Sequence, residues 1–286
     1  MKRQTIKVFE HDTLSIGQNG FKESHFKALV QFNERFGGQY LTPGFNKVKF
    51  ASYVGVYQVG NLAMEVLPKA DRGNDKEKWR NALLSMLHEC QHIRLHSLQE
   101  AELRLRSASL IDLFFDAFLL QVEQLVHRGL TKAYRQDDEN RSALKGKLLV
   151  DQQIRNNIVH RERFFVRHFL YNHDHTINRI LKEALNILAK TAASPWIISR
   201  SKNLLLSFEN VQDERISAQH FQRLTFCRKT EAYKTAVQLA RLIILHHSPD
   251  ISAGKESVLA ILFDMNTLFE EYVFRILQRS KSAVEQ

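Results

Sequence analysis

The chain has 286 residues, which is enough for one large domain or two domains of ordinary size. Its 41 Lys and Arg against 31 Asp and Glu give a net charge of +10, which indicates an anionic partner such as nucleic acid. Two cysteines exclude a disulfide framework and a four-thiolate zinc site. No apolar segment is long enough for a secretory signal or a membrane span, so we expect a soluble, cytoplasmic protein.

Strand and helix patterns alternate in the N-terminal part of the chain. Residues 4–17 are partly alternating and bounded by glycines, which predicts a strand or a hairpin. Strands are also expected over 48–67, with a hairpin turn at Gly60-Asn61, and over 101–108. Apolar residues at helical spacing predict helices over residues 22–36, 75–93 and 109–128.

The middle of the chain is polar, and the part after it is rich in helical patterns. Residues 136–147, QDDENRSALKGK, predict a loop or an exposed turn that leads into a strand at 147–150. Helix start signals follow at Thr176 and at Ser194-Pro195. Four helices are expected, over residues 175–192, 195–208, 229–247 and 263–280.

These patterns predict an α+β fold with two regions. Residues 1–174 form a mixed region of strands and helices, and residues 175–286 form a helix-rich region. In the last predicted helix, apolar residues from Phe263 to Ile276 recur at helical spacing. We therefore expect a core helix that is capped near Asn266 or Thr267.

His88, Glu89 and His92 have the spacing H-E-x-x-H. On a helix this spacing places two histidines one turn apart, where they bind zinc while the glutamate activates water. A catalytic zinc also needs a third protein ligand, and no downstream acid lies in a recognisable second motif. A zinc-dependent hydrolase is therefore an alternative, and a polar helix face in a chain with 13 histidines is the favoured interpretation.

Half of the excess positive charge lies between residues 141 and 167, where seven basic residues stand against two acidic ones. Such a segment suits contacts to phosphate groups, but it also suits an acidic protein partner or a solvated surface. A stand-alone nucleic-acid-binding protein is accordingly a second alternative. The candidate residues for binding nucleic acid or a partner are Lys145, Lys147, Arg155, Arg161 and Arg163.

Two motifs of nucleotide and metal chemistry are absent from the sequence. It has no G-x-x-x-x-G-K-[ST], so we expect no nucleoside triphosphate bound through a P-loop. It has no Asp or Glu two positions before any lysine, the D/E-x-K arrangement with which many nucleases hold Mg²⁺ and position water. We therefore predict no metal ligands and no cofactor bound by this chain.

Four segments, in chain order, carry a family pattern. They are YVGV at 53–56 with LAMEVLPK at 62–69 and LSML at 84–87; LKGKL at 144–148 with QIRNN at 153–157 and HRERF at 160–164; NRILK at 178–182 with Ala184-Leu185; and FDMN at 263–266 with LFEEYV at 268–273. Together they resemble the McrC family, the nuclease subunit of McrBC restriction systems directed against 5-methylcytosine.

The resemblance implies a division of labour between two proteins. An McrC-like N-terminal region docks on a hexameric McrB-like AAA+ GTPase and stimulates it, so GTP is bound by the partner. The C-terminal region is a PD-(D/E)XK nuclease, which uses Mg²⁺ and cuts double-stranded DNA containing modified cytosine. Glu270 takes the position of the family's helix glutamate. In the family the metal-binding strands follow this helix, and 13 residues follow Val273 here, so we expect these strands to be missing and the chain alone to be inactive.

Overall fold

The computed structural model describes residues 4–69, 75–90, 109–248 and 257–284. Its centre is a five-stranded mixed sheet in the order β1-β6-β5-β11-β10, where only β1 and β6 are parallel neighbours. The hairpin predicted at Gly60-Asn61 is confirmed, because β5 and β6 flank that turn. The strands are β1 Gln4–Phe9, β5 Tyr53–Val59, β6 Leu62–Leu67, β10 His247–Ser248 and β11 Val258–Asp264.

The strand β11 lies next to β5 in the sheet, although about 200 residues separate the two strands in the sequence. It pairs antiparallel to β5 from Val258 opposite Val59 to Asp264 opposite Tyr53. Gly55 has φ 137°, and a Cβ at this position would lie 2.1 Å from the Ile261 carbonyl oxygen, so glycine permits the close approach. A strand from the predicted second region thus completes the sheet of the first. The division between residues 174 and 175 stays a prediction.

A smaller antiparallel sheet, in the order β2-β4-β3, packs together with helix α1 on one side of the five-stranded sheet. The predicted helix over 22–36 is confirmed by α1. The hairpin considered for residues 4–17 is wrong, because β1 pairs with β6 and β2 pairs with β4. The elements are β2 Thr13–Ser15, a 3₁₀ turn Gln18–Gly20, α1 Glu23–Arg35, β3 Leu41–Gly44 and β4 Lys47–Phe50.

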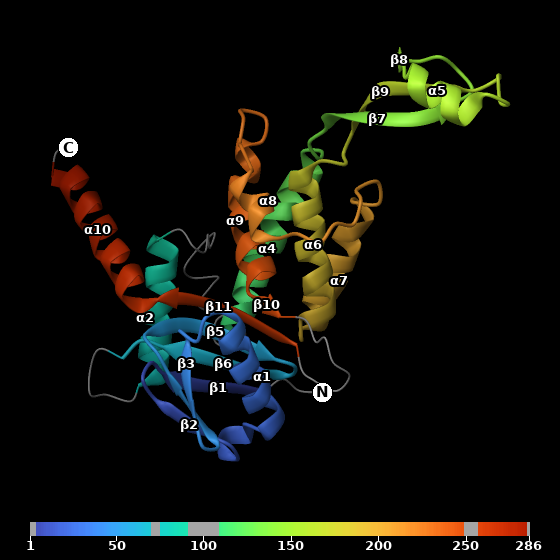
Figure 1. The fold of residues 1–286 in the computed structure, drawn as a ribbon. Coiled ribbons are helices and arrows are strands. Elements are labelled where there is room, and N and C mark those ends of the chain that lie inside the picture. Colours follow the sequence, from blue (N-terminus) through green and yellow to red (C-terminus); the bar gives the residue numbers. More distant parts are fainter. Residues whose placement is uncertain (1–3, 70–74, 91–108, 249–256, 285–286) are drawn as a thin grey trace.

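A bundle of helices stands on the other side of the five-stranded sheet (Figure 1). Its central helix α4 buries apolar side chains around most of its circumference, including Phe114, Phe115 and Phe118, as expected for a helix enclosed by others. No helix among the described residues is long and apolar enough to cross a membrane. The helices of the bundle are α4 Leu110–His127, α6 Thr176–Thr191, α7 Pro195–Leu206, α8 Ala218–Gln222 and α9 Lys234–Leu245, which follows a 3₁₀ turn Glu231–Tyr233. Helix α2 Lys76–Glu89 lies beside them and packs against β6 and the helix α10 Met265–Val284.

The structure confirms the predicted helices of the bundle, with small differences at their ends. Pro195 lies in the first turn of α7 as expected. The N-cap of α6 is His175 and not Thr176, since the His175 Nδ1 accepts a hydrogen bond from the Ile177 amide at 3.3 Å. The strand expected over 101–108 lies outside the described residues.

A buried ion pair connects the sheet to the bundle. The Glu65 and Arg80 side chains are 1% and 4% exposed, and Arg80 Nε lies 2.9 Å from Glu65 Oε2. The other Glu65 oxygen accepts a hydrogen bond from the Leu110 amide at 2.7 Å, at the first residue of α4. One carboxylate therefore links β6, α2 and the start of α4.

Three strands and one helix extend away from the body, which comprises the sheets and bundle described above (Figure 1). The sequence predicts a loop over 136–147, and this is wrong for its first part, which belongs to β7. This strand has no apolar face, so its pattern resembles a loop, and pairing with β9 along its whole length holds it extended. The elements are β7 Ala133–Arg141, β8 Lys147–Leu148, α5 Val150–Asn157 and β9 Phe164–Asn172, and we call residues 133–172 the arm.

The last helix, α10 Met265–Val284, differs from the expected core helix. Phe263 and Asp264 belong to β11, and the Asp264 side chain accepts the Thr267 amide hydrogen bond at 2.9 Å, which caps the helix. Of its apolar side chains, Leu268 is buried. Others are exposed: Phe269, Val273, Phe274, Ile276 and Leu277. The core interpretation is therefore wrong, because periodicity alone does not show whether another element covers a helix face.

Candidate functional site

The arm is the most exposed part of the structure (Figure 1). Its two long strands, β7 and β9, pair antiparallel from Ala133 opposite Asn172 to Arg141 opposite Phe164. The short strand β8 pairs with the other edge of β9. Along β7 the exposure alternates between exposed and intermediate, so neither face of this strand is fully covered. A ribbon that reaches away from the body in this way exposes its surface to a partner.

Polar side chains attach α5 to the hairpin. Asn157 is buried, and its amide exchanges two hydrogen bonds of 2.8 Å with the Asn140 amide on β7. Gln153 donates to the Arg163 carbonyl at 2.8 Å and accepts from the Phe165 amide at 2.5 Å. These contacts direct Gln153 and Asn157 inward and connect the short helix to the start of β9.

Part of the exposed surface of α5 is apolar. Val150, Ile154 and Ile158 recur every four residues and are 58%, 56% and 68% exposed, and the adjacent Val159 is 81% exposed. Helical residues four apart lie on the same face, so these side chains form one exposed apolar stripe. A stripe of this kind on a projecting element is typical of a protein-interaction surface. Sequence analysis missed it, although the four-residue spacing was visible.

Seven basic residues lie in the same part of the arm sequence, between residues 141 and 167. Arg141 and Arg167 are engaged within the arm: Arg141 lies 3.3 Å from Glu139, and Arg167 donates two 2.7 Å hydrogen bonds to Asp138. The Arg167 guanidinium lowers the pKa of the Asp138 carboxyl. None of the other five has an ion-pair partner among the described residues, and all are exposed. They are the predicted binding residues Lys145, Lys147, Arg155, Arg161 and Arg163, and we call them the tip cations.

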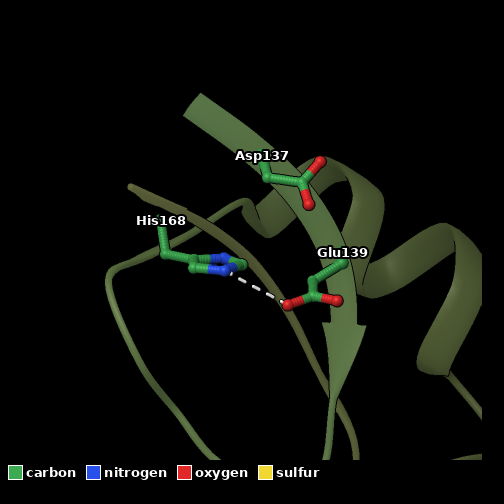
Figure 2. Close-up of side chains that lie close together, drawn as sticks. All are labelled: Asp137, Glu139 and His168. Carbon is green, nitrogen blue, oxygen red and sulfur yellow. Dashed lines mark ion pairs between the residues drawn. The ribbon is translucent and has the colours of Figure 1, made fainter. Parts of the chain in front are cut away.

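Asp137, Glu139 and His168 come together on one face of the hairpin (Figure 2). Their ligand atoms lie within 4.8 Å of one another, and the Glu139 carboxylate lies 3.2 Å from His168 Nε2. They are the residues of the arm that could hold a metal ion. However, the Arg141 guanidinium lies 3.3 Å from Glu139 and 3.4 Å from His168, and Arg135 lies 4.0 Å from Asp137. Two guanidinium groups thus balance the acidic charge, so the cluster is best described as an ionic network between β7 and β9.

Comparison with known proteins now adds to this geometry. The family model described as McrBC 5-methylcytosine restriction system component matches residues 48–286. The chain belongs to the McrC family of these components. The resemblance carried by the four sequence segments is thereby confirmed. None of the curated proteins matches the chain significantly.

Two solved structures share the fold of this McrC-family chain. One is the cryo-EM structure of the Thermococcus gammatolerans McrBC complex, with 24% sequence identity and a TM-score of 0.71 over 96% of this chain and 87% of that chain. The other is a refined half-complex from a tetradecameric assembly of Thermococcus gammatolerans McrB AAA+ hexamers with bound McrC, with the same identity and TM-score over 96% of this chain and 70% of that chain.

The H-E-x-x-H residues do not share a described helix. His88 and Glu89 lie in the last turn of α2, which ends at Glu89, and His92 lies outside the described residues. The Glu89 carboxylate lies 3.4 Å from the Arg279 guanidinium of α10. Within the described chain, the helical arrangement that the zinc-hydrolase alternative needs therefore ends before its second histidine.

Glu270 lies apart from the tip cations. It is an exposed residue in the second turn of α10, the helix that packs against α2 on the side of the body away from the arm (Figure 1). The predicted site residues thus occupy two places in this McrC-family fold. The arm carries the basic residues predicted to bind a partner, and α10 carries Glu270, whose place in a nuclease helix stays a prediction.

Proposed function

We propose that this chain is the McrC-like subunit of a modification-dependent restriction system in the cytoplasm, and that its arm docks on a McrB-like AAA+ GTPase hexamer and stimulates GTP hydrolysis by that partner. The observation that carries the proposal is the projecting arm, which bears both the five exposed tip cations and the exposed apolar stripe of α5. Membership of the family supports the system, and the structural likeness to chains from complexes of McrB with McrC supports the partner.

The surface chemistry of the arm favours a protein partner. Contacts to DNA phosphates need positive charge but gain little from Ile154 or Ile158 exposed at more than half of their surface. A protein groove gains from both, since apolar anchors supply affinity and charges around them steer the approach. Double-stranded DNA bound directly by the tip cations is the second candidate, supported by the same five exposed charges.

We also propose that α10 is the first helix of a PD-(D/E)XK nuclease fold, in which Glu270 takes part in the active site. Its exposed apolar side chains, such as Phe269 and Phe274, are what a helix needs when further elements pack on it. Mg²⁺ would be held by the D/E-x-K motif of such a nuclease, and this sequence does not contain that motif. We therefore expect no cleavage of DNA with 5-methylcytosine by this chain alone.

The test measures the GTP hydrolysis rate of a McrB-like GTPase from the same organism as a function of added chain. Replacing all five tip cations by glutamine should raise the concentration for half-maximal stimulation about tenfold or more, because several charges contribute to one interface. The matched control replaces five exposed basic residues of the body that have no ion-pair partner among the described residues, namely Lys202, Arg215, Arg223, Arg228 and Lys229.

The outcomes separate the two candidate functions. Stimulation by the tip variant at the wild-type concentration would contradict docking through the arm. A gel-shift titration at two salt concentrations addresses DNA: if the tip cations bind DNA directly, the variant loses affinity and its salt dependence flattens, whereas the control variant keeps both.

A further inference from the structure

The arm joins the body through two chain crossings, and one buried amide holds both. The chain leaves the body at Thr131, just before β7, and returns at His173, just after β9. Asn178 in the first turn of α6 has no exposed surface, and its Nδ2 donates to the Thr131 carbonyl at 2.9 Å and to the His173 carbonyl at 2.8 Å. Both strands of the arm are therefore fixed to the same point of the bundle.

Asp174 holds the arm to the bundle at a second point beside the first. Its buried carboxylate accepts 2.7 Å hydrogen bonds from Arg179 Nε and Nη2 and a 3.1 Å hydrogen bond from the Gln212 amide, all of which belong to the body. Its remaining partner comes from the arm, since Arg135 Nη1 on β7 donates to Asp174 Oδ2 at 2.5 Å. The Asp174 carboxylate thus connects the end of β7 nearest the body to α6 and to the loop after α7.

Further contacts hold these groups in place from the body side. Arg179 Nη1 donates to Glu214 at 3.0 Å, and the Thr131 amide donates to the Tyr233 hydroxyl at 2.7 Å. The Arg179 guanidinium lowers the pKa of the Asp174 carboxyl, so this carboxylate is ionised at neutral pH. Paired charges with bidentate geometry fix direction better than apolar contacts do.

We propose that Asn178 and Asp174 are positioning residues that fix the direction of the arm relative to the body. This inference rests on the proposed function, because a fixed direction matters when the arm presents its tip to a partner. It also gives a reason for a fully buried asparagine, Asn178, among the apolar side chains that α6 supplies to the core. If the arm samples other directions, the apparent affinity is the intrinsic affinity multiplied by the fraction of molecules in the correct direction.

Distances between spin labels test the direction without any partner. One label occupies the exposed native Cys227 in the body and the other a Ser142→Cys substitution in the exposed part of the arm, while native Cys90 is buried. Arg135→Gln removes the arm's contact to Asp174 and leaves the contacts of Arg179 and Gln212. The distance distribution should become at least about twice as broad. An unchanged distribution in both Arg135→Gln and Asn178→Ala overturns the inference.

The matched control is Arg141→Gln, on the same strand and face as Arg135, because Arg141 pairs with Glu139 inside the arm. It should leave the distribution narrow, and equal broadening by both variants would show loss of arm structure and overturn the positioning role. Circular dichroism and the melting temperature establish that Asn178→Ala is folded. If Asn178→Ala does not fold, the distance distribution of Arg135→Gln alone tests the inference, since Arg135 is more exposed than Asn178.

Stimulation of the GTPase gives the second measurement. Loss of direction with an intact tip should raise the concentration for half-maximal stimulation about fivefold in Arg135→Gln and leave the maximal rate unchanged, because the arm still docks once oriented. A fall in the maximal rate alone, or wild-type stimulation despite a broadened distribution, overturns the role in docking. Absence of stimulation by the wild-type chain instead refutes the proposed function, and the distances still decide the positioning.

Discussion

The body and the arm are held together by different kinds of contact. In the body, buried aliphatic and aromatic side chains form two clusters, one between the large sheet and the helix bundle and one under the small sheet and α1. In residues 133–172, all of which the structure describes, Val166 is the sole buried apolar side chain. The arm relies instead on side-chain amides, ion pairs and the β7–β9 ladder.

This difference indicates how stability and interaction are divided in the molecule. Apolar burial gives about 1.5–3 kcal/mol for each large side chain, whereas a hydrogen bond gives a net contribution of about 1 kcal/mol. The body therefore supplies most of the folding free energy. Apolar side chains of the arm, such as Ile154 and Ile158, are exposed and are available for contacts with another molecule. We expect the arm to unfold locally at a lower free energy than the body.

The largest effect should come from a cavity in the body. Phe118 in α4 has no exposed surface, so Phe118→Ala should lower the free energy of unfolding by about 3–5 kcal/mol in urea denaturation. Val166→Ala, which truncates the buried apolar side chain of the arm, should cost at most about 2 kcal/mol, because it removes a smaller side chain. Equal losses in the two variants would contradict the division between body and arm.

The pH dependence of stability also tests the comparison of body and arm, because a histidine with a strongly lowered pKa lies in the body. Burial lowers the pKa of His247 to about 4, and Arg35 and Lys190 add to this effect. The unfolded chain therefore binds a proton more readily than the folded one, and stability present above pH 6.5 is lost as the pH falls toward 4. The expected loss is on the order of 2 kcal/mol.

Thermal unfolding between pH 4 and pH 7 measures this loss. His247→Gln should flatten the pH dependence of the melting temperature over that range, since glutamine does not titrate. A variant with the same slope as the wild-type chain would show that other groups cause it. Such a result would leave the body without a dominant titrating residue in this pH range.

The smallest effect is expected in the arm. Asn157→Ala removes the paired hydrogen bonds to Asn140, which should cost about 1 kcal/mol locally. Backbone amides of β7 and β9 should exchange about fivefold faster with deuterium, while the melting temperature of the body stays within about 1 °C. The control is the exposed neighbour Asn156→Ala, which should change neither. A lower melting temperature of the body would indicate that the arm and the body unfold together.

Sequence reasoning succeeded where the structural signal was local. The apolar spacing in 109–128 and the hairpin at Gly60-Asn61 predicted α4 and the β5–β6 pair within a few residues. Charge density alone located the tip cations. Sequence reasoning failed where a strand is held by pairing with another strand that is distant in sequence. β7 has no apolar face and is held by its pairing with β9, and β11 is held by its pairing with β5. The Arg135–Asp174 contact spans 39 residues and has no local pattern, so it could not be predicted.

The pairing of β5 with β11 also has a consequence for synthesis of the protein. A ribosome has made residues 1–257 before residues 258–264 emerge and cover the β5 edge. Until then, the nascent chain has an uncovered edge of apolar residues such as Val54 and Val56, and uncovered strand edges promote aggregation. Chains that stop before residue 258 should therefore depend on chaperones or be degraded, because they lack the strand β11 that pairs with this edge.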